Sequence, residues 1–172
     1  MLRPPSLSKS WDEYVSIDGA FVQAPTLADD ANDEAKAEFA KAAEDYAAKL
    51  KAARETGDWT PMLAPGRALN EATRFTMLQV DRNIWRELLD RSTLPLDVPN
   101  RLGPAMLRAL MVRLALKSIA GLDLKIERSI DDRWGYEMAQ ADTVSYLDSI
   151  DPRVVGELGT RVIERMRGAS PL

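Results

Sequence analysis

One segment of the chain, residues 104–119, is apolar on almost every side, and it constrains what the rest can fold into. Pro104 suits the first turn of a helix and Gly121 suits a helix stop, so the segment is predicted to be helical. A helix that is apolar on most sides is buried on most sides. It is therefore either the central core helix of a small domain or a helix with one side against a partner. The side chains that form its two apolar faces are Leu107, Leu110, Met111, Val112, Leu114 and Leu116.

A second helix is predicted over residues 29–54 and differs in character. Its acidic residues gather at the start and its basic residues at the end, which complements the helix dipole, and Gly57 supplies a stop. Most of its apolar residues are alanine, so it buries little per turn. It is either a solvated helix on its own domain or an arm that packs on another subunit. A narrow stripe at spacings of three and four, close to a coiled-coil seam, is formed by Ala35, Phe39, Ala43, Tyr46, Leu50 and Ala53.

Shorter elements precede the long helix and follow it. Residues 1–10 are predicted as an extended arm, and Asp18-Gly19 between β-prone runs predicts a hairpin with a type I′ turn. Strands are predicted over 73–77 and 122–127. The remaining helices are predicted from the N-cap Asp81 to about residue 91, over 143–150, and from Asp151-Pro152 onward.

The predicted fold class is mainly α with minor β: a compact helical C-terminal domain with a short strand or hairpin, plus an N-terminal β-hairpin and long helix arm. Its predicted bounds are 1–59 for the arm, hairpin and alanine-rich helix, 60–69 for a linker containing Pro61, Pro65 and Gly66, and 70–172 for the core domain. Trp11 and Trp59 flank the least regular regions, where a tryptophan either covers a core or anchors a partner.

The 172 residues include no histidine and no cysteine. This excludes histidine-based triads, thiol nucleophiles, tetrahedral zinc sites and disulfides. We expect no enzyme activity and no cofactor. A carboxylate- or metal-dependent hydrolase is the alternative, and it would need a pocket that gathers several of the following residues: Asp131, Asp132, Glu137 and Asp142.

The formal net charge of −4 argues against a general nucleic-acid binder. A weak basic candidate is the set Arg101, Arg108, Arg113 and Lys117. No apolar run approaches the ~18–20 residues of a membrane-spanning helix, and the N-terminus lacks the apolar region of a signal peptide. We therefore expect no membrane partner and an intracellular origin.

Three stretches carry a resemblance to a family: RFTMLQVDRNIWRELLDR, LRALMVRLALKSIAGLDL and SYLDSIDPRVVGELGTRV. A short strand leading into a Trp-bearing helix, an apolar helix running into KSIAGLDL, and a terminal helix entered through SIDPRVV resemble small proteins of tailed bacteriophages and related contractile or injection particles. The resemblance covers about half of the chain. It implies a virion component of the neck, tail or baseplate, or a tail-assembly chaperone, and it transfers no catalytic residue.

Together these observations predict a non-enzymatic structural component of a phage-like virion that acts in multiple copies, made in the host cytoplasm and retained in the virion. Its expected partners are other virion proteins and copies of itself. A tail-assembly chaperone is the alternative within the same biology. The candidate contact residues are Trp11, Phe39, Tyr46, Leu50, Trp59, Leu107, Leu110, Met111, Val112, Leu114 and Leu116.

Overall fold

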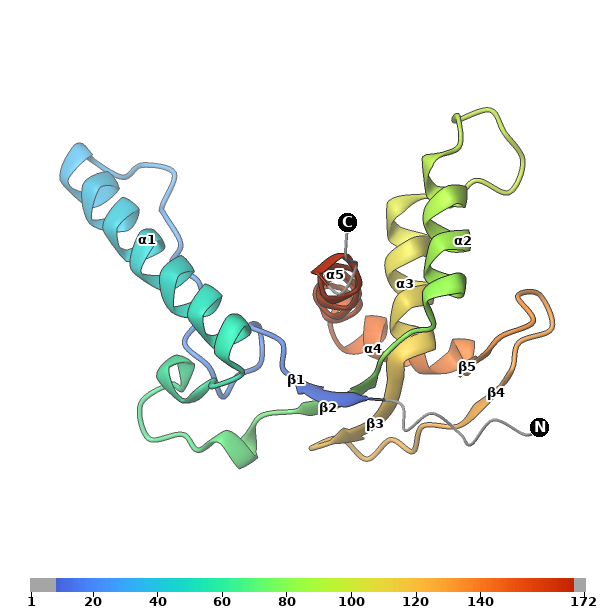
Figure 1. The fold of residues 1–172 in the computed structure, drawn as a ribbon. Coiled ribbons are helices and arrows are strands. Elements are labelled where there is room, and N and C mark those ends of the chain that lie inside the picture. The colour runs from blue at the N-terminus through green and yellow to red at the C-terminus, as the bar shows by residue number, and fades with distance from the viewer. Residues whose placement is uncertain (1–8, 169–172) are drawn as a thin grey trace. The chain divides into compact units, whose positions relative to one another are not determined.

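The computed structural model describes residues 9–168, so residues 1–8 of the predicted arm lie outside it. Within that range the chain forms five α-helices and two small antiparallel sheets, which confirms the prediction of a mainly α fold with minor β (Figure 1). The chain divides into two compact units. We call residues 16–73 the α1 unit, and residues 9–15 with 74–168 the α3 unit, each after its most informative helix.

The α3 unit contains both sheets. Strands β1 (Ser10–Glu13), β2 (Arg74–Leu78) and β3 (Leu116–Ala120) form one sheet with β2 at its centre, and β4 (Arg128–Ile130) pairs with β5 (Glu137–Ala139) in the other. The predicted strand over 73–77 is thus confirmed as β2. Alternate residues of β2 point inward, because Phe75 and Met77 are buried while their neighbours are not.

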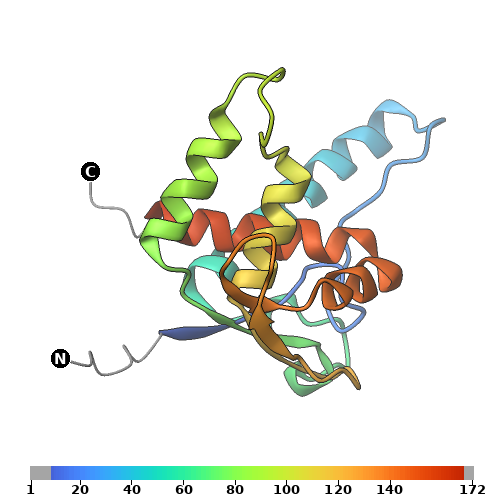
Figure 2. The same cartoon turned by 90° about the vertical axis from the view of Figure 1, so that its right-hand side faces the viewer.

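Four helices complete this unit: α2 (Arg82–Thr93), α3 (Pro104–Ala115), α4 (Ala141–Ile150) and α5 (Pro152–Gly168). Asp81 caps α2 as predicted, since its carboxylate accepts the backbone N–H of Asn83 at 2.8 Å. Helices α3 and α5 cross at Gly159, where a Cβ atom would come within 2.6 Å of the Arg108 Cβ (Figure 2). The missing side chain therefore lets the two backbones approach closely.

Helix α3 passes into strand β3 with no intervening loop. The predicted helix to residue 119 is wrong, because α3 ends at Ala115 and Leu116 already pairs with Met77 of β2. The predicted strand over 122–127 is also wrong, because those residues form a bend and irregular chain. The guanidinium of Arg128 explains how the junction is held: it donates to the carbonyl oxygens of Leu114 at 3.0 Å and Leu116 at 2.6 Å. These carbonyls lie at the end of the helix and lack helical partners.

The predicted hairpin at Asp18-Gly19 is wrong. A type I′ turn needs a positive φ at both central residues, and Gly19 does not adopt one. The carboxylate of Asp18 instead accepts the backbone N–H groups of Ala20 and Thr73, each at 2.9 Å. Phe21, which the hairpin would have paired back along the chain, forms a β-bridge with Leu63.

The α1 unit is built around α1 (Asp33–Thr56), with two short 3₁₀ helices, η1 (Thr60–Met62) and η2 (Leu69–Glu71). Helix α1 begins four residues later than predicted because Asn32 is its N-cap, and its side chain accepts the N–H of Ala35 at 2.8 Å. Gly57 ends it with a φ of 76°, as the sequence predicts. The predicted linker over 60–69 contains η1 and the first residue of η2, and the ring of Trp59 before it lies 5.1 Å from that of Phe21.

Candidate functional site

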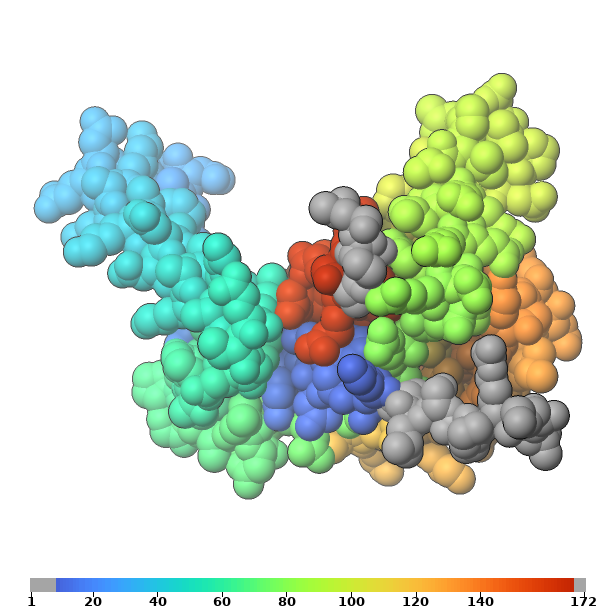
Figure 3. Space-filling model, in the orientation of Figure 1, coloured from blue at the N-terminus to red at the C-terminus, as the bar shows by residue number. Residues whose placement is uncertain are grey.

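The surface of α1 is exposed along most of the helix. The helix has 24 residues and spans about 36 Å. Ala53 is its only buried residue, and the other members of the predicted stripe are half-buried. The stripe is therefore the least exposed side of α1, and it still leaves Phe39, Tyr46 and Leu50 accessible. In the space-filling view no other segment of the α1 unit covers the visible face of α1 along most of its length (Figure 3).

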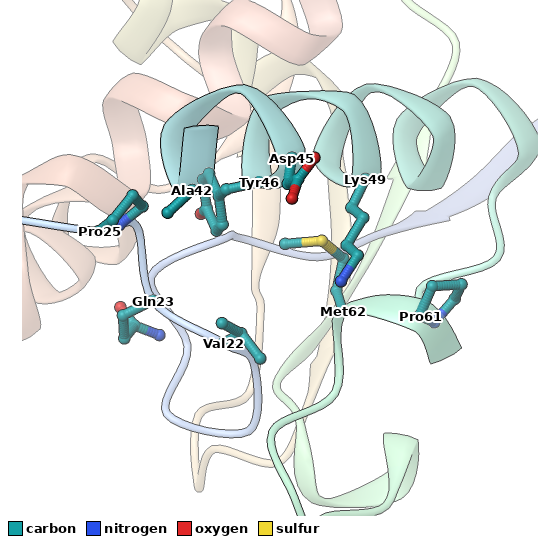
Figure 4. A pocket seen from close by; sticks show the side chains of 9 residues that line it. All are labelled: Val22, Gln23, Pro25, Ala42, Asp45, Tyr46, Lys49, Pro61 and Met62. Atoms are coloured by element: carbon teal, nitrogen blue, oxygen red, sulfur yellow. The ribbon is translucent and has the colours of Figure 1, made fainter. Parts of the chain in front are cut away.

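A pocket of about 270 Å³ opens beside this stripe. Its walls are α1, the extended segment that follows Phe21, and η1 (Figure 4). Val22 and Pro25 come from the segment, Met62 comes from η1, and Tyr46 and Lys49 come from α1. The sequence did not point to Val22, Pro25 and Lys49 as pocket residues, because part of the extended segment was expected to form a hairpin and Lys49 was interpreted only as a charge at the end of the helix.

The pocket is apolar with two charges near its rim. Asp45 and Lys49 lie four residues apart on α1 and carry opposite charges. The side-chain amide of Gln23 is already engaged, since it donates to the carbonyl oxygens of Asp18 and Phe21 at 3.0 Å each. Val22 and Leu27 of the segment are 44% and 41% exposed. This arrangement suits the docking of an apolar side chain between polar neighbours.

Charge is unevenly distributed along α1. Residues 33–45 carry five carboxylates against two lysines, whereas residues 46–56 carry three basic residues against one glutamate. The first half of the helix is therefore net acidic and the second half net basic. A surface with this polarity is complementary to a copy of itself that runs in the opposite direction.

The structure separates the predicted contact residues into three groups. Trp59 is buried at 1% exposure, and the candidates on α3 and at the start of β3 lie in the core of their own unit: Leu107, Leu110, Met111, Val112, Leu114 and Leu116. Trp11 is half-buried beneath the guanidinium of Arg165. Of the predicted set, only Phe39, Tyr46 and Leu50 lie together on an accessible helix face.

The acidic residues of the hydrolase alternative do not converge. Asp131 forms an ion pair with Arg113 at 2.6 Å and also accepts the N–H groups of Arg133 and Trp134. The hydrogen bond from Arg113 is the main reason that the pKa of Asp131 is lowered. Glu137 instead lies 3.5 Å from Arg128. Among residues 9–168 no group of three or more carboxylates is placed to hold a metal ion.

The basic candidates are also dispersed. The backbone and Cβ of Arg108 lie against Gly159 of α5. The guanidinium of Arg113 donates to the carbonyl oxygen of Ala139, a residue of β5, at 2.8 Å. Arg113 is therefore committed to the structure of the α3 unit. At least one member of the predicted set Arg101, Arg108, Arg113 and Lys117 is therefore not available to contact a nucleic acid.

Within the part of the chain that the structure describes, no helix combines the length and hydropathy needed to cross a bilayer. Comparison with known proteins gives no assignment: no family model, no curated protein and no solved structure matches this chain.

Proposed function

We propose that this protein is a non-enzymatic structural protein that acts through protein–protein contacts, and that α1 is its main contact surface. The observation that carries the proposal is the half-buried stripe on a 24-residue helix with a single buried residue. A side-chain cap at Asn32 and a left-handed stop at Gly57 define both ends of α1. The helix is thus ordered before a partner arrives, which lowers the entropic cost of binding.

The partner that the charge distribution favours is a second copy of α1 in antiparallel orientation. A pair centred between residues 44 and 45 places Phe39 opposite Leu50 of the second copy and Ala43 opposite its Tyr46. Large side chains then face smaller ones, as in interdigitated helix packing. The acidic half of each helix meets the basic half of the other, whereas a parallel pair would place like charges together.

The setting that we propose for this role is a phage-like virion, in which the protein would be present in several copies and contact other virion proteins. This setting rests on the sequence resemblance alone. A tail-assembly chaperone is distinguished by its fate, because it would be absent from the finished particle, whereas a virion component would be retained in it.

The first experiment is the solution mass, measured by light scattering after gel filtration at several concentrations. We expect a dimer or a larger oligomer that dissociates on dilution, and a charge-reversed variant with Lys49, Lys51 and Arg54 changed to Glu should be monomeric. A monomer at every concentration would contradict self-association through α1.

Cysteine cross-linking tests the orientation without interference, because the chain has no thiol of its own. In the antiparallel pair, Ala43→Cys should form a disulfide with its copy, since the two positions are about 4.5 Å apart along the axis. Phe39→Cys should not, because its copy is about 16 Å away along the axis. Ala48→Cys, on the exposed side of α1, is the matched control. Equal cross-linking at residues 39 and 43 would indicate a parallel pair instead.

A further inference from the structure

A second pocket lies wholly within the α3 unit, and three basic side chains line it. Its volume is about 270 Å³, and Lys9, Arg82 and Arg165 line it together with Trp11, Gln79 and Met166. Among the residues that the structure describes, no acidic residue lines it. The guanidinium of Arg165 lies 4.3 Å from the centre of the Trp11 ring, so the indole supports the cation from one side.

The carboxylates near these basic residues, Glu13 and Glu164, already lie beside another arginine. Glu13 lies 3.5 Å from Arg161, which is also bound to Glu164 at 2.6 Å. Glu13 is only 4% exposed, and burial raises its pKa although the charge of Arg161 opposes this. Burial likewise lowers the pKa of Arg165, and although Glu13 attracts this cation, the neighbouring Arg161 repels it. The positive charge of Arg165 is thus only partly compensated.

The pocket also has an apolar part. Trp11 is half-buried and Met166 is buried, so both present hydrophobic surface beside the cations. A volume of about 270 Å³ is slightly below the usual range for drug-sized ligands. It suits one acidic group on a small ring or short chain.

We propose that this pocket binds the oxyanion of a small organic acid or phosphate ester, with Lys9, Arg82 and Arg165 around the anion and Trp11 and Met166 against its apolar part. Guanidinium groups are well suited to the task, because they donate paired hydrogen bonds to carboxylate and phosphate oxygens. The site is independent of the contact surface on α1, so either proposal can fail without the other.

The test uses the full chain and follows its four tryptophan indole N–H signals by NMR, with the Trp11 signal assigned from Trp11→Phe. Three probes of similar shape are titrated: phenyl phosphate, phenylacetate and the neutral phenylacetamide. We expect the Trp11 signal to shift with one or both anions, and the preferred anion identifies a phosphate or a carboxylate ligand. The shift should weaken as salt is added. No shift with either anion, or an equal shift with phenylacetamide, would overturn the proposal.

Two matched pairs of variants locate the charge that is responsible. Arg165→Gln should weaken anion binding at least about fivefold, since it removes a charge-assisted hydrogen bond, whereas Arg167→Gln on the same helix should leave it unchanged. Arg82→Gln should behave like Arg165→Gln, with Arg86→Gln as its control on α2. All four positions are exposed, so the variants are expected to fold. Equal weakening by the controls would mean that the anions sense only the general surface charge.

Discussion

Helices α3 and α1 use their apolar residues in opposite ways. Six of the twelve residues of α3 are buried, including Met111 and Val112 with no measurable exposure, whereas one of the 24 residues of α1 is buried. Helix α3 buries most of its large apolar side chains within its own unit, with Met106 as an exposed exception. The α1 unit leaves a half-buried stripe and an apolar pocket accessible. The difference supports the proposal that α1 serves contact while the α3 unit serves stability, and it can be tested with the same chemical change made in each unit.

The largest effect is expected from a substitution in the core of the α3 unit. Leu158→Ala removes a fully buried side chain of α5 and should lower the free energy of unfolding by about 3 kcal/mol, because it costs transfer energy and leaves a cavity. Urea denaturation followed by tryptophan fluorescence measures the change. A loss below about 1 kcal/mol would mean that the α3 unit is less tightly packed than its burial indicates.

The close approach of α3 and α5 provides the next largest effect. Gly159→Ala places a Cβ within 2.6 Å of the Arg108 carbonyl oxygen and Cβ, so the helices must separate, at a cost of about 2 kcal/mol. Gly156→Ala is the matched control, because nothing lies within 4 Å of the added atom. It should raise stability by up to about 1 kcal/mol through helix propensity alone. Opposite signs for the two variants in thermal or urea unfolding are the expected result.

Leu50→Ala makes the same chemical change in α1 as Leu158→Ala makes in α5. Because Leu50 is only half-buried, we expect a loss of less than about 1 kcal/mol in the stability of the monomer. Its main effect should be a weaker oligomer, measured by the concentration dependence of the solution mass. A large loss of monomer stability with unchanged association would reverse the roles assigned to the two helices.

The smallest expected effect is a shift in a single titration. A hydrogen bond from Arg153 is the main cause that lowers the pKa of Asp151 to about 2. Because the pKa is lower in the folded state than in the unfolded chain, this contribution to stability is present above the unfolded pKa and is lost as the pH falls through about 2. Carboxyl NMR titration should show that Arg153→Gln moves the pKa back toward the ordinary value. An unchanged midpoint would remove Arg153 as the cause.

Local signals in the sequence predicted the elements that depend on local chemistry. The cap at Asp81 and the stop at Gly57 each follow from one residue type in a helical pattern. The elements that depend on distant partners were not predictable in this way. The local sequence around Asp18-Gly19 predicts a hairpin turn. In the structure the Asp18 carboxylate instead accepts a hydrogen bond from the backbone N–H of Thr73, which is 55 residues away.

The candidate sites show the same limit. The stripe of α1 was visible in the spacing of Phe39, Tyr46 and Leu50, although its partial exposure was not. The alternation of Leu122, Leu124 and Ile126 correctly indicates a half-buried side, but side-chain periodicity alone does not supply the neighbouring strand that a sheet needs. The basic pocket combines residues from both ends of the described chain, Lys9 and Arg165, so no local pattern could have revealed it.

The C-terminal end of helix α3 is held by Arg128, a residue that is synthesised after the helix. Arg128, whose guanidinium holds the carbonyl oxygens of Leu114 and Leu116, also donates to the carbonyl of Glu137 on the neighbouring strand β5. The carbonyl oxygens of Leu114 and Leu116 therefore gain this side-chain partner only when Arg128 and the β4–β5 hairpin have folded back onto the end of α3. On a ribosome, the carbonyl oxygens at the end of α3 would lack this side-chain partner until at least residue 128 had been synthesised. During this interval the apolar helix α3 has been fully synthesised, but the carbonyl oxygens at its end still lack the side chain that holds them in the folded protein.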